Sequence, residues 1–360
     1  MVRITALFTF VLMLLVCTAF FYLPDLHRYE EGVREEYIRE AALRDNIRKI
    51  DDLSELTGIE LLTYNNRVSE IKEEEVYFSE QFRLAMPEGT DASEVEIEND
   101  YRNHSILIHI NGAEEDYMYQ YPMLGTPEGL TDLTWQDGTV DLLLDSVYEV
   151  KRRDAGEYLY LDLVKPHEVY DRVIVVDAGH GGKDVGAVRG DIFEKDLNLA
   201  ITMELEDLFK EASLQNVGVY FTRMSDEKPT YPDRVALAEE TEADLFLSIH
   251  CNTASKAGSK ASGTTVLYNE NADGSYDAKA LAELMAEEVA ASFETNDRGA
   301  SEGSRIFIIR ESDVPVVLVE VGFMSNPDEL KKLTTEPSQR KAAEGILNGV
   351  IKAFQEGLLQ

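Results

Sequence analysis

Three polar side chains follow strand-like runs in the second half of the sequence. His180 stands in a glycine-rich turn directly after residues 173–176, a β-branched run that indicates a buried parallel strand. His250 and Glu320 end two further apolar runs. In open α/β sheets, chemistry takes place just beyond the carboxyl ends of the strands, so we expect these three side chains to converge there.

A fourth group, Glu194, lies shortly after the glycine-rich turn. His180, Glu194 and His250 fit a two-histidine, one-glutamate zinc site with one coordination position open for water, and we expect one Zn²⁺ ion. Zinc lowers the pKa of its water toward about 7, and Glu320 would be the general base. Taken alone, Glu194 fits a surface carboxylate in an acidic chain, and a single strand-end histidine is more often structural. The set of four favours the metal site.

Residues 173–326 resemble the zinc-dependent N-acetylmuramoyl-L-alanine amidases of the Amidase_3 type. The resemblance covers about half of the chain, in order and with ordinary spacing. One departure is Cys251, where the family more usually has a small residue such as alanine. The segments that carry the resemblance are 177–182 (DAGHGG), 194–199 (EKDLNL), 222–223 (TR), 234–238 (RVALA), 248–252 (SIHCN) and 319–326 (VEVGFMSN).

The resemblance implies an enzyme that hydrolyses the amide bond between N-acetylmuramic acid and L-alanine in peptidoglycan. It assigns His180, Glu194 and His250 to the metal, and gives Glu320 the transfer of a proton from water to the departing amine. Alternatives are a zinc peptidase that cuts another amide of the wall peptide, and a peptidoglycan-binding protein without activity. A cysteine hydrolase based on Cys251 is disfavoured, because adjacent residues at a strand end point in different directions.

Other residues near the motifs are candidates for supporting roles. Asp177 is expected to orient the loop of His180 rather than to bind the metal. Asn252, Arg310 and Asn326 are candidates for substrate binding.

Composition restricts the function classes. The chain has 360 residues, with 69 Asp and Glu against 34 Lys and Arg, and a formal net charge of −35. Nucleic-acid binding needs a basic surface, so this class is excluded. The two cysteines, Cys17 and Cys251, give no disulfide framework.

The N-terminal quarter of the sequence predicts a membrane attachment. Residues 4–23 carry no charge and are long enough to span a bilayer. We interpret them as an uncleaved anchor that leaves the catalytic domain on the extracytoplasmic side of the cell membrane; the alternative is a cleaved signal peptide and a secreted protein. Residues 26–75 are charged and helix-favouring, which indicates a helical spacer.

Two domains are expected after the spacer. Residues 76–166 show short alternating runs separated by turn signals, typical of a small all-β sandwich. In pattern and position this module weakly resembles AMIN-type domains, which makes it a candidate site for a regulator in the envelope. Residues 172–358 alternate strand and helix, which predicts an α/β catalytic domain: a mostly parallel sheet with helices on both faces. A strand is expected at 305–309, before the one at 316–320.

Overall fold

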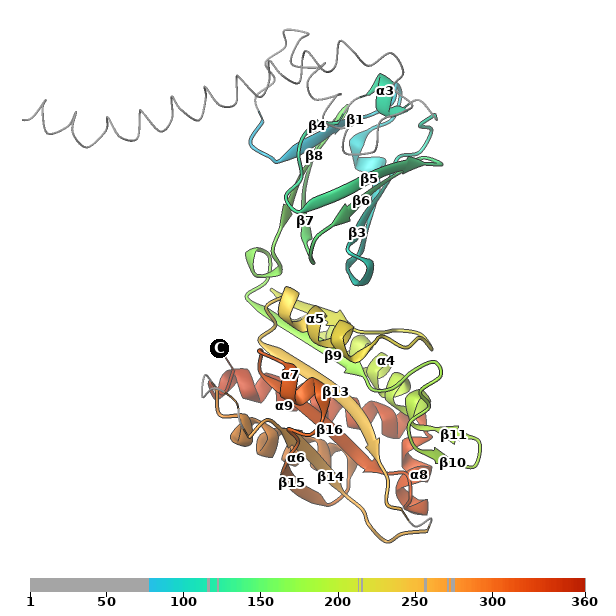
Figure 1. The fold of residues 1–360 in the computed structure, drawn as a ribbon, viewed down its shortest axis with the longest axis vertical. Coiled ribbons are helices and arrows are strands. Elements are labelled where there is room, and N and C mark those ends of the chain that lie inside the picture. Colours follow the sequence, from blue (N-terminus) through green and yellow to red (C-terminus); the bar gives the residue numbers. More distant parts are fainter. Residues whose placement is uncertain are drawn as a thin grey trace, which may run out of the picture.

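The computed structural model describes residues 78–359, except 115–116, 122, 213, 215, 256–257, 271 and 273–275. A β module precedes an α/β domain (Figure 1). The membrane helix expected at 4–23 and the spacer expected at 26–75 lie outside the described residues. No helix in the described part is both long enough and apolar enough to cross a bilayer.

The β module consists of two four-stranded antiparallel sheets, with strand orders β4-β1-β8-β7 and β2-β3-β6-β5. Alternate residues of the strands point into a common core, because successive side chains of a strand face opposite sides. Ile106 and Ile108 from one sheet and Leu159 and Leu161 from the other are fully buried there. The strands are β1 (Phe82–Ala85), β2 (Glu96–Asp100), β3 (Ser105–His109), β4 (Leu124–Gly125), β5 (Leu130–Gln136), β6 (Thr139–Leu144), β7 (Glu149–Ala155) and β8 (Tyr158–Val164), with a short helix α3 (Tyr117–Gln120).

A six-stranded sheet in the order β12-β9-β13-β16-β14-β15 forms the centre of the α/β domain. Four of its five strand pairs are parallel, and only β14 and β16 run antiparallel. The mostly parallel sheet predicted from the alternation of elements is therefore confirmed. Its strands are β9 (Arg172–Ala178), β12 (Val217–Phe221), β13 (Leu245–Asn252), β14 (Thr264–Tyr268), β15 (Asp297–Glu302) and β16 (Val316–Phe323).

Helices cover both faces of this sheet (Figure 1). Alternate residues of β9 enter two cores: Ile174 and Val176 pack under α4, α6 and α9, whereas Val173 and Val175 pack with α5 and α7. A strand buried on both faces is continuously apolar, as the sequence of β9 is. The helices are α4 (Glu194–Ala212), α5 (Tyr231–Glu240), α6 (Ala278–Phe293), α7 (Phe307–Glu311), α8 (Pro327–Leu333) and α9 (Glu336–Gln355).

The prediction of a strand at residues 305–309 is wrong. Ile308 and Ile309 are consecutive and both are buried in the same core, which a strand does not allow because its neighbouring side chains face opposite sides. They lie instead on the short helix α7. The sheet is completed by β15, an edge strand with the polar sequence DRGASE whose composition gives no strand signal.

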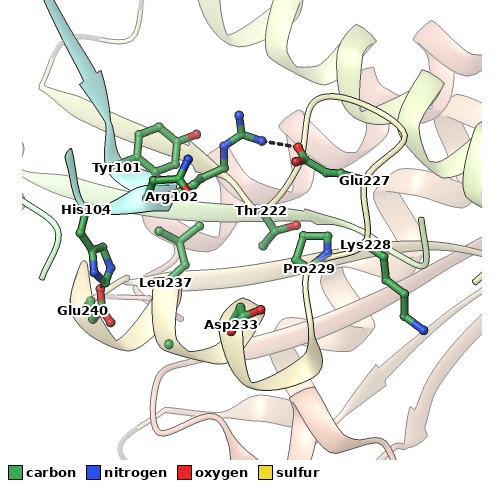
Figure 2. Close-up of a pocket in the computed structure, with 12 residues that line it drawn as sticks. Tyr101, Arg102, His104, Thr222, Glu227, Lys228, Pro229, Asp233, Leu237 and Glu240 are labelled. Carbon is green, nitrogen blue, oxygen red and sulfur yellow. Dashed lines mark hydrogen bonds and ion pairs between the residues drawn. The ribbon is translucent and has the colours of Figure 1, made fainter. Parts of the chain in front are cut away.

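The β module contacts the edge of the central sheet. The Tyr101 hydroxyl accepts a hydrogen bond from the amide of Phe221 at 2.9 Å, and Val147 is buried in the core that includes Val173. A pocket of about 400 Å³ lies at this junction. Figure 2 shows Arg102 pointing toward Glu227 across it, with an ion pair between their side chains. The two domains are thus joined by specific contacts as well as by the connecting chain.

Candidate metal centre

The backbone after β9 turns sharply and places His180 at the carboxyl end of the sheet. His180 adopts a positive φ of 62°, a conformation that residues with a Cβ rarely take. The preceding residue, Gly179, lies against the ring of His250: a Cβ at this position would be 2.2 Å from His250 Nε2. Glycine is therefore required where the two histidine segments meet.

The structure brings His180, Glu194 and His250 together. One ligand atom from each lies within 4.8 Å of the others. His180 Nε2 is 3.2 Å and His250 Nδ1 is 2.9 Å from the same carboxylate oxygen, Glu194 Oε1. The second nitrogen of His180 is 3.0 Å from Asp184 Oδ1, so this carboxylate orients the ring and directs Nε2 toward the site. The sequence interpretation did not identify Asp184; its place four residues after His180 was the available signal.

Glu194 is the first residue of α4, and its side chain is buried. Its Oε2 accepts a hydrogen bond from the amide of Ala187 at 2.8 Å. Burial alone would raise the pKa of this carboxyl, but the hydrogen bonds and charges of His180 and His250 hold it well below the usual range. Glu194 is therefore an anion at neutral pH, as a metal ligand must be.

Glu320 lies in β16, in register with His250 of β13. Burial raises the pKa of this carboxyl to about 7, an effect that the nearby histidine charges only partly oppose. Its Oε2 is buried and accepts no hydrogen bond from any described residue. A carboxyl group that titrates near neutral pH is suited to accept and return a proton.

A buried polar cluster under the site holds the loop of His180. Asp177 forms an ion pair with Arg234 and accepts hydrogen bonds from Thr222 and Ser248, each at 2.6 Å. Arg234 also donates to the carbonyl oxygen of His180 at 2.5 Å. Arg223, equally buried, donates to the carbonyl oxygens of residues 178, 179 and 195. These arginines therefore position backbone, and Asp177 anchors the loop without facing the ligand atoms.

The three residues predicted to bind substrate lie in different surroundings. Asn252 lines the same pocket as Glu320. Asn326 caps the N-terminus of α8 and donates to the carbonyl oxygen of residue 261. Arg310 lies on α7, before the start of β16, and pairs with Glu311. A substrate contact remains a prediction for all three, and of the three only Asn252 lines the described pocket that contains Glu320.

Cys251 is fully buried, and burial raises the pKa of its thiol well above the ordinary value. A nucleophilic cysteine needs an accessible thiolate. The geometry thus disfavours the cysteine-hydrolase alternative.

The donor set fits zinc. Two imidazole nitrogens and one ionised carboxylate oxygen face each other, as in catalytic zinc sites with two histidines and one glutamate. His180 is held by the carboxylate of Asp184 and Glu194 by the backbone amide of Ala187, which is the outer support that metal ligands require. A metal ion held by these three residues and the carboxyl group of Glu320 could therefore act on the same bound molecule.

Residues 174–352 match the family model Amidase_3, described as N-acetylmuramoyl-L-alanine amidase. A Bacillus subtilis protein named YqiI, described as uncharacterized, is 38% identical over 185 residues, which are 51% of this chain and 86% of that protein. The germination-specific N-acetylmuramoyl-L-alanine amidase of the same organism is 32% identical, with 51% of this chain and 81% of that protein covered. The catalytic domain of CwlV, an N-acetylmuramoyl-L-alanine amidase from Bacillus (Paenibacillus) polymyxa, aligns with 51% of this chain and 98% of that domain at 35% identity and a TM-score of 0.47.

Proposed function

Because the chain belongs to the Amidase_3 family of N-acetylmuramoyl-L-alanine amidases, we propose that it hydrolyses the amide bond between N-acetylmuramic acid and L-alanine in peptidoglycan. The observation that carries this proposal is the juxtaposition of two groups: a His180, Glu194 and His250 ligand set and, in register with His250, a buried carboxyl group with a pKa of about 7. A hydrolase needs both a site that polarises the amide and a group that moves the proton.

His180, Glu194 and His250 would hold one zinc ion. When bound, zinc supplies Lewis-acid chemistry, since it polarises a carbonyl oxygen and makes water more acidic. Glu320 takes a proton from the attacking water while the oxygen forms a bond to the carbonyl carbon. It then gives the proton to the nitrogen of alanine as the carbon–nitrogen bond breaks. Asp184 keeps His180 in the required orientation, and Asp177 with Arg234 holds the loop from which His180 projects.

The remaining parts of the proposal concern location. Peptidoglycan lies outside the cytoplasmic membrane, so the α/β domain acts on the extracytoplasmic side. Residues 4–23 serve as the anchor, and the β module is the surface offered to an envelope regulator. The uncharged sequence of residues 4–23 and the place of the β module in the chain, between those residues and the α/β domain, support these assignments.

The experiment is digestion of purified peptidoglycan by the full-length protein, with and without a chelator. We expect new free N-terminal alanine on the released peptides, its loss on chelation, and its return with zinc. Glu320→Gln should retain zinc and lose at least about a hundredfold in rate, because general acid–base catalysis contributes that much. Glu311→Gln, which changes an exposed carboxylate on α7, is the matched control.

Other outcomes identify the alternatives. Release of peptides with a different new terminus indicates a zinc peptidase acting elsewhere in the stem. Binding to peptidoglycan without any release from the zinc-loaded protein indicates a non-catalytic binding protein and contradicts the proposal.

A further inference from the structure

A pocket of about 310 Å³ opens beside Glu320 at the carboxyl-end edge of the sheet. It is formed by side chains of β13, β14, β15 and β16, so four strands hold it in shape. Among its lining residues the charged ones are Glu320 and Arg298. The lining residues are Asn252, Thr265, Leu267, Arg298, Ser301, Glu320 and Phe323.

Arg298 is an exposed side chain on the edge strand β15. Its guanidinium carbon lies 5.2 Å from the centre of the Phe323 ring, three residues beyond Glu320 in β16. The face of an aromatic ring attracts a guanidinium through a cation–π interaction, so the Phe323 ring helps to hold the Arg298 side chain in this position. Its one hydrogen bond to a described residue is to the carbonyl oxygen of Ser262 at 3.4 Å, close to the upper limit for such a bond.

No described carboxylate forms an ion pair with Arg298, although the chain has twice as many acidic as basic residues. Arg310, which is also exposed, is paired with Glu311, and the half-buried Arg340 is paired with Glu211. Arg305 is likewise exposed without an ion pair to a described carboxylate, but it does not line this pocket. Arg298 therefore presents an unneutralised guanidinium to the pocket that also holds the proposed catalytic glutamate. Its planar donors can bind a carboxylate through two parallel hydrogen bonds.

We propose that Arg298 binds a carboxylate on the peptide part of the substrate and makes the enzyme selective for stems that carry a free carboxylate there. This inference rests on the proposed function. In that substrate the carboxyl group of muramic acid is consumed in the amide that is cut, so the negative charges that remain lie on the peptide side. A cation beside Glu320 thus distinguishes the peptide side from the neutral sugar side, and fixes the direction in which the stem lies.

The experiment compares synthetic N-acetylmuramoyl-peptides in matched pairs that differ only by a carboxylate or a carboxamide. One pair differs at the second residue of the stem and another at the C-terminus. We measure kcat/KM for the wild type, Arg298→Ala and Arg298→Lys, with Arg340→Ala as the control that removes a paired arginine outside this pocket. The wild type should prefer the carboxylate of one pair about tenfold or more, since a hydrogen bond to a charged group is worth that factor.

Arg298→Ala should abolish this preference by slowing only the carboxylate substrate, while the carboxamide is cut at the wild-type rate. Arg298→Lys should retain part of the preference, and Arg340→Ala all of it. The inference is overturned if the wild type cuts both members of each pair equally, if Arg298→Ala keeps the preference, or if that variant slows both members alike. If the wild type cuts no muramoyl–alanine amide in any substrate, the proposed function itself fails, and the inference with it.

Discussion

His250 and Glu320 face each other in register on the neighbouring parallel strands β13 and β16. Residues paired in this way project from the same face of the sheet, so a metal-ligand candidate and a proton acceptor are fixed side by side by backbone hydrogen bonds. A slip of one residue would turn Glu320 to the opposite face, into the core. The strand pairing is thus itself part of the site.

The pH dependence of the reaction should report the buried carboxyl group of Glu320. Burial raises its pKa from 4.5 to about 7, so the group becomes protonated, and inactive as a base, as the pH falls through that value. The positive charge of bound zinc opposes this shift, so we expect the acidic limb of kcat/KM between pH 4.5 and 7. Zinc content measured at each pH separates this limb from metal loss. A flat profile over that range, with zinc retained, would contradict the assignment.

Gly179→Ala should weaken zinc binding while the fold persists. The added Cβ would lie 2.2 Å from His250 Nε2 and must displace the ring. We expect a loss of about tenfold or more in zinc affinity, the scale seen when the support of a metal ligand is disturbed. Competition with a chromophoric chelator measures it.

Gly190→Ala is the matched control for Gly179→Ala. Gly190 has a φ of 60° and no atom within 4 Å of an added Cβ, so the variant has backbone strain without a contact to the site. Its zinc affinity should equal that of the wild type. Equal losses in both variants would mean that the effect of Gly179→Ala is one of general stability.

Asp177→Asn should destabilise the α/β domain strongly. The change leaves the buried Arg234 without its anion, and breaking a buried ion pair typically costs about 3–5 kcal/mol. Urea denaturation at pH 7 measures the difference. Glu311→Gln breaks an exposed pair with Arg310 and should change the free energy of unfolding by less than about 1 kcal/mol.

The loss of unfolding free energy caused by Asp177→Asn should depend on pH. Burial raises the pKa of Asp177, but Arg234 and the hydroxyls of Ser248 and Thr222 outweigh it, so the folded value is below 3.8. A group with a lowered folded pKa stabilises fully above its unfolded pKa and loses this contribution as the pH falls through the folded value. The difference between wild type and variant should therefore be constant from pH 7 to 5 and shrink below about pH 4. If the difference in unfolding free energy between wild type and variant already shrinks between pH 7 and 5, it comes from the titration of a group other than Asp177.

The junction between the domains should depend on the Tyr101 hydroxyl more than on the ion pair beside it. Tyr101→Phe leaves the amide of Phe221 without its acceptor, which costs about 1–3 kcal/mol for a buried donor. Arg102→Ala removes a partly exposed pair with Glu227, worth about 0–1 kcal/mol. Hydrogen exchange of the Phe221 amide should accelerate in Tyr101→Phe and remain slow in Arg102→Ala. The opposite order would show that the ion pair holds the junction.

The sequence alone determined the elements that position the site. A continuous β-branched run such as residues 173–176 indicates a buried strand, and glycines beside His180 indicate a turn at a strand end, so the ligand segments and their order along the chain were predictable. His180, His250 and Glu320 were predicted from their places after such runs, whereas Glu194 was predicted from the set of four and from the family resemblance.

Only the tertiary structure showed which isolated polar residues lie beside the proposed site. Arg298 lies on an edge strand without hydrophobic alternation, and nothing in its neighbourhood in the sequence connects it to Glu320. The sequence does not show where Arg223 and Arg234 lie, and the fold buries them against backbone carbonyls. The contact of Tyr101 with β12 likewise joins residues 120 positions apart. Local patterns record burial and turns, whereas contacts between distant segments arise only when the chain packs.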